Sequence, residues 1–313
     1  MKLSKLLKET KIKVLKEDEV DDKVADLSKA FQTDSVPAYV SLLQQYQSDP
    51  KVLAVLKAGV TDGKPDDEKF AVGSATLAVK DLKPTQNEIG AQESIKNIVT
   101  DEYGSLKTFL QGTADVGGPI ITYNGEYVLD GHHRWSQVYA ANPDAKIPAI
   151  NVTGKLDPKD ILKAVHTAIA VDAGQTKTIA ANLKAGNLLT YSDEDVKKMV
   201  EDNLQDKARD VWKDFGFDSD DKILKRIQDN VKEMLSKSKP ESWAPKRDSM
   251  PQPDASGAKD WGVALKKGEV NLIDPRKSDV KDSYQPKNLD SKLFEAVLKK
   301  SIKEFSKITK RKK

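Results

Sequence analysis

The fold is decided by the stretch Ile120-Ile121-Thr122-Tyr123-Asn124-Gly125-Glu126-Tyr127-Val128-Leu129-Asp130-Gly131-His132-His133-Arg134-Trp135. Within it, Asn124-Gly125 separates two runs of β-branched and aromatic residues, and both central residues of such a turn favour positive φ. We therefore predict a β-hairpin whose second strand ends at Asp130-Gly131. After that glycine the apolar residues return at helical spacing, and Asn142-Pro143 ends the predicted helix.

A polar cluster falls in the first turn of this predicted helix. Its members are Gly131, His132, His133 and Arg134. Backbone N–H groups at a helix start lack partners within the helix, and the helix dipole favours an anion there. We therefore expect a phosphate group to bind at this turn. Arg134 suits a forked grip on phosphate oxygens, and an ion pair with Asp130 or Glu126 is its structural alternative.

Two of the three histidines in the chain are the adjacent His132 and His133. Neighbours on a helix point about 100° apart, so the two rings are expected to serve different faces. A metal site would need three or more convergent ligands, and only Asp130 and Glu88 are obvious additions. Phosphate binding is therefore favoured over metal-only chemistry.

Five segments are predicted along the chain. Strand and helix signals alternate between residues 69 and 155, and this alternation predicts a compact α+β unit. The segments directly before and after this unit have mainly helical spacing. The segments are an N-terminal arm and helical pair at 1–68, the α+β domain at 69–155, a helical region at 156–236, an extended strap rich in Pro, Ser, Asp and Lys at 237–290, and a basic C-terminal helix at 291–313.

Within the α+β domain, one strand is expected from Ala75 to Leu82 and a return strand from Lys146 to Val152. Pro148 in the return strand favours an edge position, because proline has no N–H for a sheet ladder. Trp135 and Tyr139 on the motif helix are expected in the core, with base stacking as their alternative. The apolar spacing also predicts helices beginning near residues 36, 50, 90, 106, 157, 179, 196 and 223.

Composition narrows the class of protein. The 313 residues are 38% hydrophobic and 32% charged, which suggests one modest core. The absence of cysteine excludes disulfides and thiolate metal sites, and it favours a cytoplasmic or virion setting over secretion. No apolar run approaches the roughly 18 residues of a membrane span, so no membrane partner is expected.

The net charge of +3 is unevenly distributed. Residues 292–313 carry nine Lys or Arg against Glu295 and Glu304, a balance of +7 that leaves −4 for residues 1–291. A uniformly basic DNA-binding surface is therefore not predicted. The basic tail is a candidate contact for nucleic acid, and the N-terminal arm and the strap are candidate contacts for protein assembly partners.

Two short motifs carry a family resemblance. Asp130-Gly131-His132-His133-Arg134-Trp135, after a hairpin and before a helix, resembles the second signature box of the ParB/sulfiredoxin superfamily. The upstream segment Leu82-Lys83-Pro84-Thr85-Gln86-Asn87-Glu88 resembles the first box, in which a strand ends in a Pro-x-Gln turn. Together the boxes span about a quarter of the chain, and they imply a ParB/sulfiredoxin-like mixed domain.

In this superfamily the second box holds nucleotide phosphates, so the resemblance implies a site for ATP or another nucleotide. It implies that Asp130 positions Mg²⁺ or the histidines, and that Glu88 is a base for a hydroxyl acceptor. Asp130 and His132 are further catalytic candidates. The implied phosphate-binding residues are Gln86, Gly131, His132, His133 and Arg134.

The chain also departs from known members of the superfamily. Sulfiredoxin needs a cysteine directly after the motif glycine, where this chain has His132, so that reaction is excluded. Partition CTPases have a box that resembles Gly-Glu-Arg-Arg, and we identify no helix-turn-helix after this domain. The Asp-Gly-His-His-Arg form is most similar to free-serine kinases and to phage or plasmid members, some of which are labelled nucleases.

Functions of different classes fit these features. One is a nucleotide-binding enzyme that transfers or hydrolyses a phosphoryl group at the motif. Another is a structural protein of a phage virion or other assembly, which retains the domain as a scaffold. A third is a ParB-like nuclease or DNA-binding protein.

Overall fold

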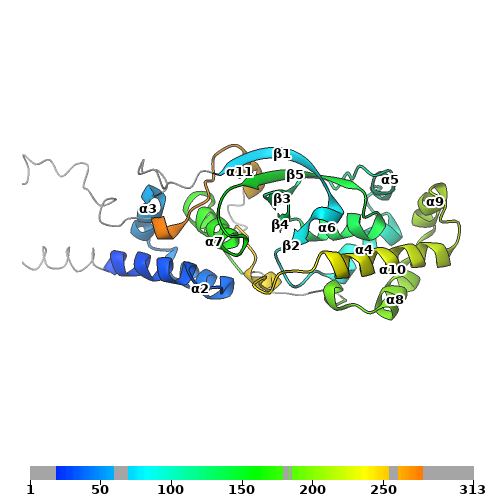
Figure 1. The fold of residues 1–313 in the computed structure, drawn as a ribbon, viewed down its shortest axis with the longest axis horizontal. Helices are drawn as coiled ribbons and strands as arrows, with labels where there is room; N and C mark the ends of the chain where they lie inside the picture. The colour runs from blue at the N-terminus through cyan, green and yellow to red at the C-terminus, as the bar shows by residue number, and fades with distance from the viewer. Residues whose placement is uncertain (1–18, 60–69, 179–182, 184, 254–259, 278–313) are drawn as a thin grey trace, which may run out of the picture.

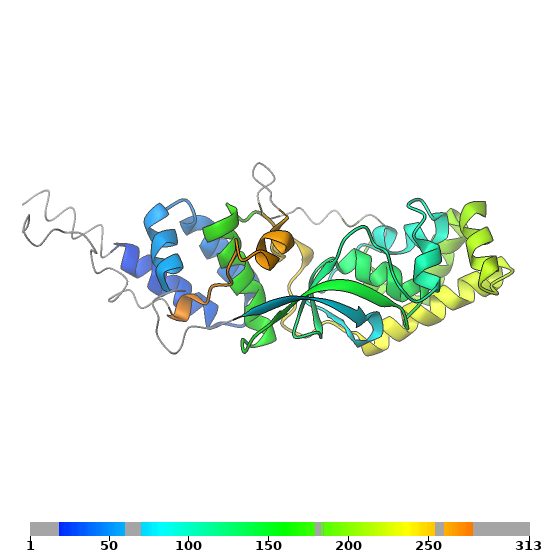
Figure 2. The same ribbon diagram turned by 90° about the horizontal axis from the view of Figure 1, so that it is seen from above.

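The computed structural model describes residues 19–59, 70–178, 183, 185–253 and 260–277. A five-stranded mixed sheet lies between two groups of helices along the long axis of the molecule (Figures 1 and 2). The α+β class expected from the sequence is confirmed in this form. The predicted basic helix at 291–313 and the arm before residue 19 lie outside the described residues.

The sheet has the strand order β1-β5-β3-β4-β2. Its strands are β1 (Ala71–Ala78), β2 (Lys83–Pro84), β3 (Ile120–Tyr123), β4 (Tyr127–Asp130) and β5 (Lys146–Thr153). Asn124 and Gly125 join β3 to β4 with φ of 52° and 69°, as the hairpin signal predicts. β2 runs parallel to β4, which brings the segment after Pro84 beside the end of β4.

Two predictions about the strands are wrong. The first strand begins at Ala71 and ends at Ala78, because residues 79–81 form a 3-10 turn. β5 lies between β1 and β3 and not at an edge. The backbone N–H and C=O of Lys146 are hydrogen-bonded to residues 112–114, on the side of β5 away from β1. Because backbone groups alternate direction along a strand, the backbone nitrogen of Pro148, two residues later, points to the same side. β3 starts to pair only at Ala149, and the missing N–H of Pro148 therefore faces no strand.

The first group of helices packs on one face of the sheet. It comprises a helix at 19–31, α2 (Val36–Tyr46), α3 (Pro50–Gly59), α7 (Pro158–Ala168) and α11 (Trp261–Lys266). Asp157 caps α7, Ser35 caps α2, and a proline stands in the first turn of each. These helices share one buried apolar cluster with Ile121, Leu129 and Ile150 of the sheet.

The second group covers the opposite face. It comprises α4 (Ala91–Thr100), α5 (Leu106–Leu110), α6 (His132–Ala141), α8 (Asp193–Asn203), α9 (Asp206–Asp214) and α10 (Asp220–Lys237). Trp135 and Tyr139 are fully buried here with ring centroids 5.8 Å apart, which confirms their expected place in the core. The described residues therefore form two buried clusters, and the expectation of one core is wrong.

The predicted helical region at 156–236 is split between the two groups, because α7 packs with the N-terminal helices. Two helices were not predicted from the sequence. They are α9, which follows α8 after a link of two residues, and α11, which lies within the predicted strap. The helix predicted near residue 179 falls almost wholly outside the described residues.

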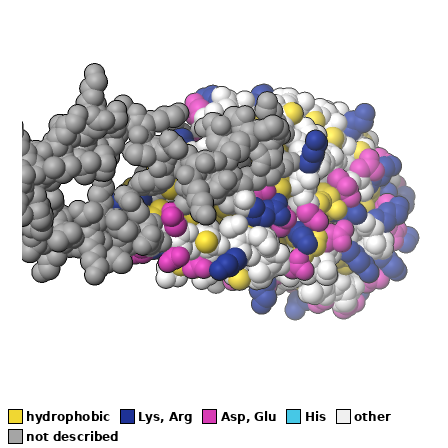
Figure 3. Space-filling view, turned by 60° about the vertical axis from the view of Figure 1, so that its left-hand side comes forward, with side chains coloured by type: hydrophobic (Ala, Val, Ile, Leu, Met, Phe, Trp, Pro, Cys, Tyr) yellow, Lys and Arg dark blue, Asp and Glu magenta, His cyan; other side chains and the backbone are white. Residues whose placement is uncertain are grey.

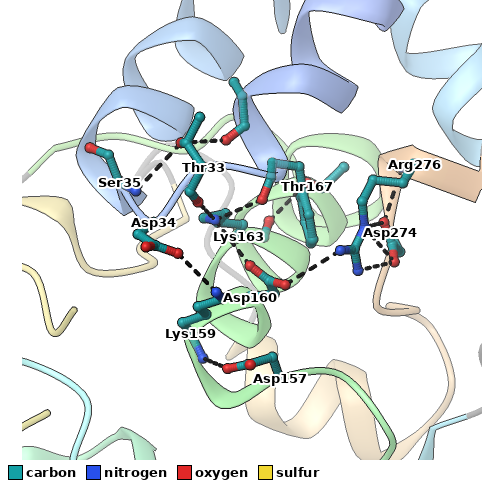
Figure 4. Close-up of polar contacts among 12 residues, drawn as sticks. Thr33, Asp34, Ser35, Asp157, Lys159, Asp160, Lys163, Thr167, Asp274 and Arg276 are labelled. Carbon is teal, nitrogen blue, oxygen red and sulfur yellow. Dashed lines mark hydrogen bonds and ion pairs between the residues drawn. The ribbon is translucent and has the colours of Figure 1, made fainter. Parts of the chain in front are cut away.

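Buried charges join the first group of helices to the segment after α11 (Figure 4). Lys163 on α7 is fully buried, and its Nζ donates to Asp160 Oδ1 at 3.0 Å and to the Phe31 carbonyl at 2.8 Å. Arg276 lies 3.5 Å from Asp160 and 2.7 Å from Asp274. The network thus ties three separate parts of the chain together.

The surface carries charges of both signs. On the face shown in Figure 3, Lys and Arg side chains are interspersed with Asp and Glu. Among the described helices, none combines the length and apolar character needed to cross a membrane.

Candidate phosphate-binding site

The site is built around the junction between β4 and α6, where Gly131 has a φ of +90°. A Cβ at this position would lie 2.6 Å from Ile120 Cγ2 and 3.0 Å from Arg134 Nη2. Glycine is therefore required twice, for the left-handed backbone and for the close approach of its neighbours. The first turn of α6 follows directly, as the sequence predicts.

His132 connects this turn to the first box. Its Nε2 accepts the backbone N–H of Thr85 at 3.2 Å, and Thr85 Oγ1 donates to the Val128 carbonyl at 2.7 Å. Burial, with His133 adjacent, lowers the pKa of His132 to about 3, so the ring is neutral. A neutral ring that accepts at Nε2 carries its proton on Nδ1. The ring therefore positions the two boxes, and its catalytic role stays a prediction.

His133 makes a similar contact at a second point. Its Nε2 accepts the backbone N–H of Gly90, directly before α4, at 3.1 Å. Burial lowers the pKa of His133 to about 4, with the nearby charge of Arg247 as a second cause. The adjacent rings thus reach backbone groups five residues apart, which agrees with the expectation that they serve different faces.

Arg134 folds back over the start of its own helix. Its Nη1 donates to the carbonyls of Gly118 and Pro119 at 3.1 and 2.9 Å, and its Nη2 lies 3.3 Å from Asp130 Oδ2. The structural alternative for Arg134, an ion pair with Asp130, is therefore present. The guanidinium still lines the cavity described next, with 31% of the side chain exposed.

A cavity of about 290 Å³ opens over the first turn of α6. One wall is the motif, with Gln86 of the first box beside it. The opposite wall is the segment 245–253, a part of the predicted strap at 237–290 that crosses from the end of α10 toward α11. Gln86 is 4% exposed at the base of the cavity. The lining residues from the strap are Arg247, Met250, Pro251 and Gln252.

Arg247 also lines the cavity and was not predicted from the sequence as a site residue. Its guanidinium lines the cavity, and within the described ranges it makes no hydrogen bond or ion pair. Its backbone N–H donates to Glu88 Oε2 at 3.2 Å, which fixes the strap at this point. The only sequence signal was a Lys-Arg pair between Pro245 and Pro251, in the segment predicted to be extended.

Glu88 faces the strap and is absent from the cavity lining. Its carboxylate accepts the Arg247 N–H and lies 4.0 Å from Lys246 Nζ, and the neighbouring Asn87 N–H donates to the Pro245 carbonyl at 2.9 Å. In this arrangement the carboxylate anchors the strap. Its assignment as a general base stays a prediction.

Asp130 is the acidic residue in the lining of the first cavity. Burial raises its pKa, while Arg134 opposes that shift. The part of the chain that the structure describes holds no cluster of three His, Cys, Asp or Glu side chains suited to a metal ion. Mg²⁺ is commonly held by one or two carboxylates together with substrate phosphates, and Asp130 fits only that limited role.

Taken together, the fold and the site define an α+β protein with a basic cavity at a helix start. Comparisons of the chain with models of known protein families, with curated proteins and with solved structures found no match.

Proposed function

We propose that this chain binds a nucleotide through its phosphate groups in the cavity at the start of α6. The observation that carries the proposal is Arg247, a half-buried residue whose side chain makes no hydrogen bond or ion pair within the described residues, and which lines the same cavity as the first turn of α6. Both features attract anions, and guanidinium groups bind phosphate oxygens through paired N–H groups. Arg134 adds a second cation to the same lining.

The resemblance to the ParB/sulfiredoxin superfamily supports the nucleotide as the class of ligand. The two boxes that carry the resemblance contact each other through Thr85 and His132. On this proposal, residues 69–155 form a ParB/sulfiredoxin-like domain and the strap completes its ligand site. Phosphotransfer to a hydroxyl, or hydrolysis of the nucleotide, is the accompanying reaction. Any Mg²⁺ would rest on Asp130 and the nucleotide phosphates.

Calorimetric titration of the full chain with ATP, ADP and CTP, with and without Mg²⁺, tests the proposal. Arg247→Ala should weaken binding by about 1.5–3 kcal/mol, the range for hydrogen bonds to charged groups. Lys246→Ala is the matched control, because this neighbouring cation lies outside the cavity lining and its side chain is 69% exposed. It should bind as the wild type does.

Two results would contradict the proposal. Unchanged affinity in a folded Arg247→Ala variant would remove the arginine from the site. Failure of all three nucleotides to bind the wild type would remove the nucleotide itself, and the interpretation as an assembly scaffold would then be favoured.

A further inference from the structure

A second cavity of about 370 Å³ adjoins the first. Asp130, Arg134 and Gln252 line both cavities, so the two share a wall. A ligand whose charged end lies beside Arg247 can therefore extend past these three residues into the second cavity. Each cavity is near the lower end of the range of about 300–1,000 Å³ for small-molecule sites.

One part of the lining of the second cavity is apolar. Ile121 and Ile150 come from the sheet, and Trp261 comes from the first turn of α11. They are 2%, 4% and 5% exposed, so they are held in place by the surrounding core. A Cβ on Gly262 would lie 2.5 Å from Ile121 Cδ1, which shows how closely α11 approaches the sheet. The walls are thus rigid and suited to a flat apolar group.

The charged groups of the second cavity are already paired. Arg134 contacts Asp130 at 3.3 Å. Asp260 accepts the backbone N–H groups of Gly262 and Val263 at 3.0 and 3.2 Å. Arg247 lines only the first cavity. The second cavity therefore favours an uncharged group, in contrast to the first.

Gln252 supplies a polar group at the shared wall. Its backbone carbonyl accepts the Lys177 N–H at 3.1 Å, which holds the residue in position. Its side-chain amide makes no hydrogen bond within the described ranges. An amide offers both donors and an acceptor, which is the pattern that a nucleobase edge requires.

We propose that the second cavity binds the nucleoside part of the nucleotide, with Trp261 against the base and Gln252 at its edge. This inference rests on the proposed function, because the phosphates in the first cavity set the direction of the ligand. A contact with the nucleoside implies that the protein binds a nucleotide more tightly than an inorganic polyphosphate.

The experiment compares ATP with inorganic tripolyphosphate by calorimetry on the full chain. The wild type should bind ATP about tenfold or more tightly than tripolyphosphate, since stacking of a base on an aromatic ring is worth about 1–3 kcal/mol. Trp261→Leu should reduce this ratio severalfold and leave the tripolyphosphate affinity unchanged, because Trp261 lines only the second cavity. Gln252→Ala should also reduce the ratio severalfold, although Gln252 lines both cavities.

Val263→Ala is the control for changes in α11, because Val263 is 42% exposed and is not part of the cavity lining. Thermal unfolding verifies that each variant is folded, and Gln252→Ala tests the idea even if Trp261→Leu fails to fold. Equal wild-type affinity for ATP and tripolyphosphate would overturn the inference and leave the phosphate site standing. Equal loss of both ligands in Gln252→Ala would also overturn it. If neither ligand binds, the proposed function itself fails.

Discussion

Replacing Lys163 by Met tests the buried charge network that holds the first group of helices together. Methionine keeps much of the apolar stem and removes the ammonium group, whose Nζ contacts Asp160 and the carbonyls of Phe31 and Thr33. Removing one partner of a buried ion pair costs about 3–5 kcal/mol, because the other charge stays buried. Arg276, 3.5 Å from Asp160, still compensates that carboxylate. We therefore expect a loss near 3 kcal/mol, at the low end of the range.

Urea unfolding followed by tryptophan fluorescence and circular dichroism measures this loss. Lys159→Met is the matched control on the same helix, since its ion pair with Asp34 is exposed and should contribute nothing measurable. The double variant Asp160→Asn with Lys163→Met should lose less than the sum of the single variants, because the two residues interact directly. If Lys163→Met unfolds at the same urea concentration as Lys159→Met, the assigned role of the network is wrong.

Two further predictions concern the motif and the histidines. Gly131→Ala should destabilise the fold by about 1–3 kcal/mol, because alanine is strained in the left-handed backbone at this position, and it should weaken nucleotide binding. An unfolding midpoint equal to that of the wild type would refute this steric argument. Burial lowers the pKa of His166 to about 4, against about 6.5 when unfolded, so the unfolded chain binds more protons as pH falls. Stability should therefore be lost below neutrality, by about 1 kcal/mol between pH 7.5 and 5.5 from this residue. His166→Gln should remove this share of the dependence measured by urea unfolding, while the shares of His132 and His133, whose pKa values are also lowered by burial, should stay.

The sequence was most informative where the signals were local. The turn at Asn124-Gly125, the glycine before α6 and the cap of α7 each act over a few residues, and the structure has the predicted hairpin and helices there. The position of β5 between β1 and β3 could not be predicted from such local signals. It depends on where β3 begins to pair relative to Pro148, which is a tertiary relation.

The same limit applies to the site. Gly131, Arg134 and Gln86 line the cavity as their motif positions suggested. His132 and His133 line the same cavity, and their rings also accept backbone N–H groups, a contact that the residue type does not reveal. Arg247 was missed because its relevance arises from contacts with a segment 159 residues away in the chain.

The separation between Glu88 and Arg247 has a consequence for synthesis of the protein. Chains generally fold from the N-terminus as they are made, and contacts between distant residues form late. Helix α6, whose first turn lines the cavity, is complete by residue 141. Arg247, on the opposite wall of the cavity, is synthesised more than one hundred residues later. A nascent chain therefore passes through a stage in which the first wall of the site exists without the second. On the proposed function, the chain would therefore gain its nucleotide site late in folding, once Arg247 has joined the first turn of α6.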